Sequence, residues 1–145
     1  MEAYLGTWEY HHELADKNEQ KFRDDLKMDD ETVKKILASK PIIRVMKVGE
    51  NMRIKLETAG GEFDQDDIFY LDGKDSTIQL PDGRKARGKF SLKDGIMRAD
   101  NMKLDNVAGL TVNETMVVKD GWMTVTMVIP EENLTTVAKY KKLQD

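Results

Sequence analysis

Two kinds of hydrophobic periodicity divide the chain at Pro41. Before Pro41, apolar residues recur at helical spacing, and the positions that carry this pattern are Phe22, Leu26, Val33, Ile36 and Leu37. After Pro41, apolar and polar residues alternate with a period of two, which is typical of half-buried strands. The chain therefore begins with a short strand, continues with two short amphipathic helices and then becomes strand-rich.

Capping signals set the predicted limits of the two helices. Asp16 followed by Glu19 forms a capping-box pattern and predicts the start of the first helix. Asp29 or Asp30 is suited to cap the second helix. Pro41 ends that helix, because proline cannot continue the helical hydrogen-bond pattern.

The strands are separated by turn residues throughout the second part of the chain. Asp-Gly pairs at 72–73, 82–83, 94–95 and 120–121 supply the positive φ that tight hairpins need. The predicted strands cover residues 4–12, 42–48, 51–58, 68–71, 77–80, 84–92, 96–102, 110–118, 122–129 and 135–142.

A meander of about ten such strands with short loops is expected to close on itself, because closure removes exposed sheet edges. We therefore predict an all-β chain, a ten-stranded antiparallel up-and-down barrel forming a single domain over residues 1–145. The helix pair lies between the first two strands and is too short to surround the barrel, so we expect it to cap one open end. The interior of such a barrel is large enough to suggest a ligand cavity.

Composition limits the classes of function. The 145 residues are 39% hydrophobic, carry a net charge of −4 and include no cysteine, which excludes disulfides and thiolate metal sites. The negative charge argues against nucleic acid as a partner. No apolar run is long enough to span a membrane and no leader precedes Tyr4, so we expect a cytoplasmic protein, or alternatively a secreted one after removal of a signal peptide.

No catalytic or metal signature stands out. None of the serines, Ser39, Ser76 and Ser91, lies in a nucleophile elbow. The neighbouring His11 and His12 would point to opposite faces of a strand. The acidic segment 64–67 lacks the spacing of a calcium loop and suggests a solvated turn. We expect no enzymatic activity, no metal and no cofactor.

Several segments resemble the intracellular lipid-binding family, which includes the fatty-acid-binding and cellular retinoid-binding proteins and belongs to the calycin superfamily. The similar segments are 5–8, 40–55, 82–87 and 92–95, and their order around a helix pair is more specific than any one of them. The resemblance implies a β-clam barrel with a helical portal that holds one small hydrophobic ligand, such as a fatty acid, a retinoid or a related lipid.

The departures from the family pattern concern the ligand headgroup. The resemblance implies an Arg-x-Tyr near the C-terminus, but here Ala138 precedes Lys139 and Tyr140. A second expected Arg is replaced by Glu114, or by Asn113 in an alternative register. The predicted ligand-binding residues are Arg84, Tyr140, Glu114, Ala138 and Phe22.

These replacements change which headgroup we expect the ligand to have, but lipid binding is still expected. Burying about 14 methylenes contributes on the order of 11 kcal/mol gross, whereas one charge-assisted hydrogen bond contributes about 1.5–3 kcal/mol. A neutral lipid is therefore favoured over a free fatty acid. The alternative function is a protective, heat-soluble barrel without a specific ligand.

The expected partners follow from this picture. They are a small hydrophobic ligand and a membrane that the helical cap contacts transiently, with the protein itself a monomer. Basic residues surround the predicted helices, and they form either a solvated face or a surface that attracts anionic lipids: Lys17, Lys21, Arg23, Lys27, Lys34 and Lys35.

Overall fold

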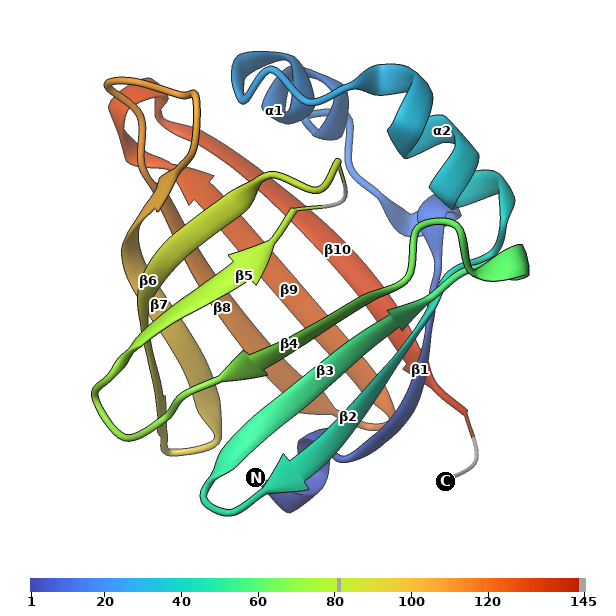
Figure 1. Cartoon of the computed structure of the whole chain (residues 1–145), viewed down its shortest axis with the longest axis vertical. Coiled ribbons are helices and arrows are strands. Elements are labelled where there is room, and N and C mark those ends of the chain that lie inside the picture. Colours follow the sequence, from blue (N-terminus) through green and yellow to red (C-terminus); the bar gives the residue numbers. More distant parts are fainter. Residues whose placement is uncertain (81, 144–145) are drawn as a thin grey trace.

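The computed structural model describes residues 1–80 and 82–143 and shows ten antiparallel strands with two helices at one end (Figure 1). The predicted all-β barrel fold is confirmed. The strands are β1 (Gly6–Tyr10), β2 (Ile42–Val48), β3 (Asn51–Glu57), β4 (Gln65–Phe69), β5 (Asp75–Gln79), β6 (Lys85–Lys93), β7 (Ile96–Leu104), β8 (Val112–Lys119), β9 (Trp122–Ile129) and β10 (Leu134–Lys142).

The strands form one continuous sheet that curls into a nearly closed barrel. Its order is β4-β3-β2-β1-β10-β9-β8-β7-β6-β5, so the first and last strands of the chain pair with each other. Tyr10 of β1 lies opposite Tyr140 of β10 in this pairing. The two ends of the sheet, β4 and β5, are consecutive in sequence but do not form a ladder with each other.

The tight turns follow the Asp-Gly signals. Asp94 and Gly95 have φ of 55° and 78° and join β6 to β7, while Asp120 and Gly121 have φ of 54° and 81° and join β8 to β9. Glycine adopts positive φ without a steric penalty, and aspartate tolerates it better than most residues. The predicted turn at 81–83 is described only at Asp82 and Gly83, since Pro81 lies outside the described residues.

Two short α-helices cover one open end of the barrel (Figure 1). They are α1 (Glu19–Asp25) and α2 (Asp30–Ala38), and single 3-10 turns occur at Glu2–Tyr4, His12–Leu14, Ala59–Gly61 and Pro130–Glu132. The helices turn Phe22, Leu26, Val33 and Ile36 toward the barrel, where each is at most 6% exposed. The amphipathic pattern predicted these faces correctly.

The predicted capping box at Asp16 is wrong. Helix α1 begins at Glu19 with Asn18 as its N-cap residue. The Asp16 carboxylate accepts hydrogen bonds from the Asn18 backbone N–H, the Thr136 hydroxyl and the Val137 backbone N–H. Asp16 therefore fixes the loop before α1 to β10 rather than capping a helix. The second helix does begin after Asp29, as predicted.

The acidic segment 64–67 was expected to form a solvated turn, but most of it lies in a strand. Gln65, Asp66 and Asp67 lie in strand β4, with Asp66 paired across the ladder to Lys55 and bound through its side chain to Arg53. Asp67 is partly buried and accepts a hydrogen bond from the backbone N–H of Gln79 in β5. The segment thus forms one edge of the sheet instead of a solvated turn.

The end of the barrel opposite the helices is filled by aromatic side chains. Trp8 is fully buried, as expected for a core residue, and its indole N–H donates to the Tyr4 carbonyl oxygen at 2.9 Å. The Tyr4 hydroxyl lies 2.6 Å from the Met116 carbonyl oxygen.

Among the described residues, no helix has the length and apolar character needed to cross a membrane.

Candidate ligand cavity

A cavity of about 310 Å³ lies inside the barrel beneath the helices. Most of its lining is apolar and comes from both helices and from strands on every side of the barrel. The apolar lining includes Phe22, Leu26, Met28, Val33, Ile36, Ile43, Ile54, Phe69, Ile78, Met102, Val112, Met116, Met123, Val125, Met127 and Ala138. A concave space of this size and composition is typical of a site for a small apolar molecule.

The methionines divide between the cavity and the surrounding core. Met116, Met123 and Met127 line the cavity. Met52 and Met97 are almost fully buried but lie outside the described lining. Flexible thioether side chains allow an apolar surface to adapt to the shape of a ligand.

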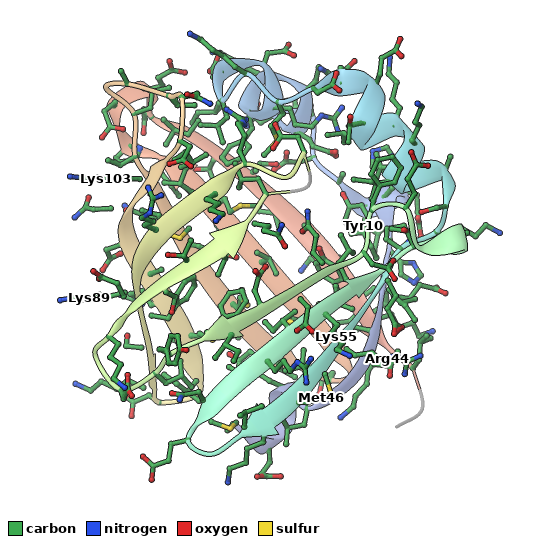
Figure 2. All side chains as sticks on the ribbon, in the orientation of Figure 1. Tyr10, Arg44, Met46, Lys55, Lys89 and Lys103 are labelled. Atoms are coloured by element: carbon green, nitrogen blue, oxygen red, sulfur yellow. The ribbon has the colours of Figure 1, made fainter. Side chains whose placement is uncertain are left out.

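Five of the polar side chains that line the cavity are linked to one another by ring contact, ion pairing or charge, and we refer to them as the polar corner: Tyr10, Glu19, Arg23, Glu114 and Tyr140. They come from β1, α1, β8 and β10, elements that are distant in sequence. Figure 2 labels Tyr10, which lies on β1 below the helical cap. The pairing of β1 with β10 places the rings of Tyr10 and Tyr140 5.2 Å apart.

Glu114 is directed into the barrel by the alternation of strand β8. Val112, Glu114 and Met116 share the inner face, whereas the side chain of Asn113 faces outward and accepts a hydrogen bond from the Asn101 backbone N–H. The residues opposite Glu114 on the neighbouring strands are Ala99 and Met127. Glu114 is only 8% exposed, and no group of the described residues donates a hydrogen bond to its carboxyl.

Burial controls the protonation of this carboxyl. Removal from water disfavours the charged form and raises the pKa of Glu114 to about 7. The same burial raises the pKa of Tyr140 to about 12, and the charges of Glu114 and Glu19 act in the same direction. Both groups are therefore held largely in their neutral forms in mildly acidic solution, ready to exchange hydrogen bonds with a ligand.

Arg23 contributes a cation to the polar corner from helix α1. Its side chain is 12% exposed, its Nη1 contacts the Glu19 carboxylate one turn earlier, and its Nη2 donates to the Gln20 amide oxygen at 2.7 Å. Its Nε is buried and has no hydrogen-bond partner within residues 1–80 and 82–143. Arg23 was predicted to lie on a basic face around the helices, but the structure turns it into the cavity.

The structure brings together four of the five ligand-binding residues predicted from the sequence. Phe22, Glu114, Ala138 and Tyr140 all line the cavity. Arg84 is absent from the described lining. Its Nε donates to the Asp82 carboxylate at 2.8 Å, and the two side chains are 15% and 7% exposed.

Sequence reasoning missed Tyr10, Glu19 and Arg23 as cavity residues. The alternation of the first strand could have placed Tyr10 on the same face as Trp8. The spacing of Glu19, Phe22, Arg23 and Leu26 on one side of a helix could have indicated the other two.

Within residues 1–80 and 82–143, no group of three acidic or histidine side chains has the arrangement of a metal site.

Comparisons with known proteins agree with this architecture. No family model matches the chain. The liver fatty acid-binding protein of Schroederichthys bivius is 26% identical over 112 residues, which cover 77% of this chain and 84% of that protein.

Solved structures of fatty-acid-binding proteins have the same fold. Fatty-acid-binding protein 1 of Echinococcus granulosus superimposes with a TM-score of 0.78 at 23% identity and covers 99% of this chain and 100% of that one. The Schistosoma mansoni fatty acid binding protein in complex with arachidonic acid gives a TM-score of 0.80 at 18% identity, with 99% and 98% covered.

Proposed function

Because this chain has the β-clam barrel of the intracellular lipid-binding family and resembles that family in sequence, we propose that it is a non-catalytic carrier of one small hydrophobic ligand. The observation that carries the proposal is the apolar cavity of about 310 Å³ enclosed by the barrel and the two helices. Fatty acids are the ligands named for its relatives, and arachidonic acid occupies one of the structural neighbours.

The finer part of the proposal is that the preferred ligand has an uncharged headgroup. Ala138 provides no charge where the family pattern has an arginine, and Glu114 adds a buried carboxyl. A fatty-acid carboxylate would face this carboxyl, and the two would repel each other once Glu114 is ionised. An uncharged headgroup avoids this repulsion and can still form a hydrogen bond with Glu114. Phe22 and Tyr140 complete the proposed contacts, and Arg84 remains a predicted contact that awaits its own test.

Exchange of ligand is proposed to occur at the helical cap during transient contact with a membrane. Lys21 and Lys34 on the cap are exposed, although they pair with Asp25 at 2.7 Å and Asp30 at 3.2 Å. These pairs reduce the positive charge that the cap presents to lipid. Ligand transfer to vesicles should consequently depend only weakly on the anionic lipid content, in contrast to transfer by a strongly basic surface.

A titration of matched ligands tests the proposed function. Octadecanol and octadecanoic acid should each displace a fluorescent lipid probe from the wild type at pH 8, with the alcohol binding more tightly. Glu114→Gln should gain affinity for the acid, and the exposed control Glu50→Gln should bind both ligands as the wild type does.

Native mass spectrometry of the purified protein provides an independent check through any co-purified lipid. If neither matched ligand displaces the probe and no lipid co-purifies, the carrier function is rejected in favour of a protective barrel.

A further inference from the structure

The polar corner contains groups whose hydrogen-bonding capacity the protein does not use. The Glu114 carboxyl receives no hydrogen bond from the described residues, and Tyr10 and Tyr140 make ring contact but no hydrogen bond through their hydroxyls there. The buried Nε of Arg23 also lacks a hydrogen-bond partner in the part of the chain that the structure describes. Buried polar groups are normally satisfied, so unsatisfied groups that line a cavity indicate what a ligand must supply.

The remaining polar groups near this corner are already occupied. Glu19 and Gln20 accept from the two terminal nitrogens of Arg23. Asp16 accepts from Thr136 and Val137 of β10. A headgroup that enters the corner therefore meets Glu114 as an acceptor and Tyr10, Tyr140 and Arg23 as donors.

Four simple headgroups differ in how well they match this set. A carboxylate offers only acceptors and would face Glu114. An ammonium offers only donors, leaves Arg23 unsatisfied and brings a second positive charge into the corner. A hydroxyl has its donor and acceptor on one oxygen. A carboxamide is uncharged and places its N–H donors and its carbonyl acceptor on different atoms. It can therefore donate to Glu114 and accept from one of the donors of the corner at the same time.

We propose that the polar corner selects long-chain amphiphiles with an amide headgroup. The amide N–H donates to the Glu114 carboxyl, and the amide oxygen accepts from the Tyr140 hydroxyl or from the Nε of Arg23. The acyl chain occupies the apolar remainder of the cavity, lined by Phe22 and the inward-facing methionines. This inference rests on the proposed carrier function and specifies its ligand class.

The charges that act on the corner support a placement of the amide next to Tyr140. Burial is the main cause of the raised pKa of the Tyr140 hydroxyl, and the charges of Glu114 and Glu19 act in the same direction. Burial is also the main cause of the raised pKa of Tyr10, to which Glu19 and Tyr140 add while Arg23 opposes it. Tyr140 therefore lies within electrostatic reach of the acidic groups on β8 and on α1. A headgroup beside Tyr140 therefore lies within electrostatic reach of the same two acidic groups.

A displacement experiment with four C18 ligands tests the proposal. Octadecanamide, octadecanol, octadecanoic acid and octadecylamine compete against a fluorescent lipid probe at pH 7 with the wild type and with Glu114→Leu, Tyr140→Phe and Arg23→Met. Lys21→Met is the matched control, because it removes an exposed, ion-paired cation from the same helix. Circular dichroism verifies that each variant retains the barrel.

The expected result is that the amide binds the wild type at least tenfold more tightly than each of the other three. Glu114→Leu should abolish that preference, at least one of Tyr140→Phe and Arg23→Met should reduce it tenfold, and Lys21→Met should retain it. The proposal is overturned if another ligand binds as tightly as the amide, if the preference survives Glu114→Leu, or if neither donor variant changes it. Failure of all four ligands to displace the probe would instead reject the carrier function itself.

Discussion

The carboxylate of Asp16 accepts a hydrogen bond from the hydroxyl of Thr136 at 3.0 Å. Its other oxygen accepts from the backbone N–H of Val137 at 3.1 Å, so one side chain ties the entrance of the helical cap to strand β10. Thr136 is 4% exposed, and Val137 lies next to Ala138, which lines the cavity. The position of the cap over the cavity is thus coupled to the strand that carries Tyr140.

Replacement of Asp16 by alanine should loosen the cap. The substitution leaves a buried hydroxyl and a backbone N–H without their acceptor, so we expect a loss of about 1–3 kcal/mol in the free energy of unfolding. Ligand release, measured by stopped-flow fluorescence, should become faster. Asp16→Asn retains one acceptor oxygen and should show an intermediate effect. An unchanged release rate in Asp16→Ala would show that ligand release does not depend on this attachment of the cap.

The raised pKa of Glu114 predicts a pH-dependent stability. In the folded protein this pKa is about 7, compared with an ordinary value of 4.5. Between these two pH values the folded state binds a proton that the unfolded state has released, so stability falls as the pH rises toward 7 and is then constant. The full difference is on the order of 3 kcal/mol. Urea unfolding of the wild type and Glu114→Gln at pH 5 and pH 8 should show this loss in the wild type alone.

Tyr140 and Arg84 should respond differently to the loss of their polar groups. Tyr140→Phe should weaken ligand binding by about 1–3 kcal/mol, because its hydroxyl faces the cavity and has no described partner. Arg84→Met should lower stability, since Asp82 is buried and would lose its cation, and its effect on affinity tests the predicted ligand contact. Isothermal titration calorimetry combined with thermal unfolding separates the two effects. A fall in affinity with Arg84→Met would support the sequence-based assignment of Arg84 to the ligand site.

Restoring a cation at position 138 should reverse the proposed ligand preference. Ala138 lines the cavity on the same strand as Tyr140. In the double variant Ala138→Arg/Glu114→Gln, a guanidinium can pair with a carboxylate while the opposing carboxyl is removed. We expect affinity for octadecanoic acid to rise by about 1.5–3 kcal/mol relative to octadecanol. The variant Thr135→Arg, which adds the same charge on an exposed position of β10, should not change the preference.

The sequence was sufficient to predict the barrel because its strongest signals are local. Alternation along β8 placed Glu114 and Asn113 on opposite faces, and the Asp-Gly pairs fixed the hairpins at β6–β7 and β8–β9. The choice of Glu114 as the inward residue depended on the register of the family resemblance. The structure places that residue in the cavity.

The features that the sequence did not reveal depend on contacts between distant elements. Asp16 has a typical capping pattern, but two of its three hydrogen-bond donors lie on β10, more than a hundred residues later. Arg23 is one of several cations near the helices, and only the docking of α1 turns it inward. Strand β4 carries acidic residues because it lies at an edge of the sheet, so it lacks the apolar alternation that identifies central strands.

The unpaired edges at β4 and β5 have a consequence for how this protein behaves at high concentration. A free strand edge is a template onto which another chain can add, and uncontrolled addition leads to fibrils. Here Asp67 of β4 binds the backbone N–H of Gln79, and the Gln65 amide donates to the Leu80 carbonyl oxygen at 2.6 Å. The Asp67 side chain occupies a main-chain N–H of β5 that an incoming strand would need, and the Gln65 side chain holds β4 to the residue that follows β5. The gap between β4 and β5 is thereby protected against edge-to-edge polymerisation, although the two strands do not pair with each other.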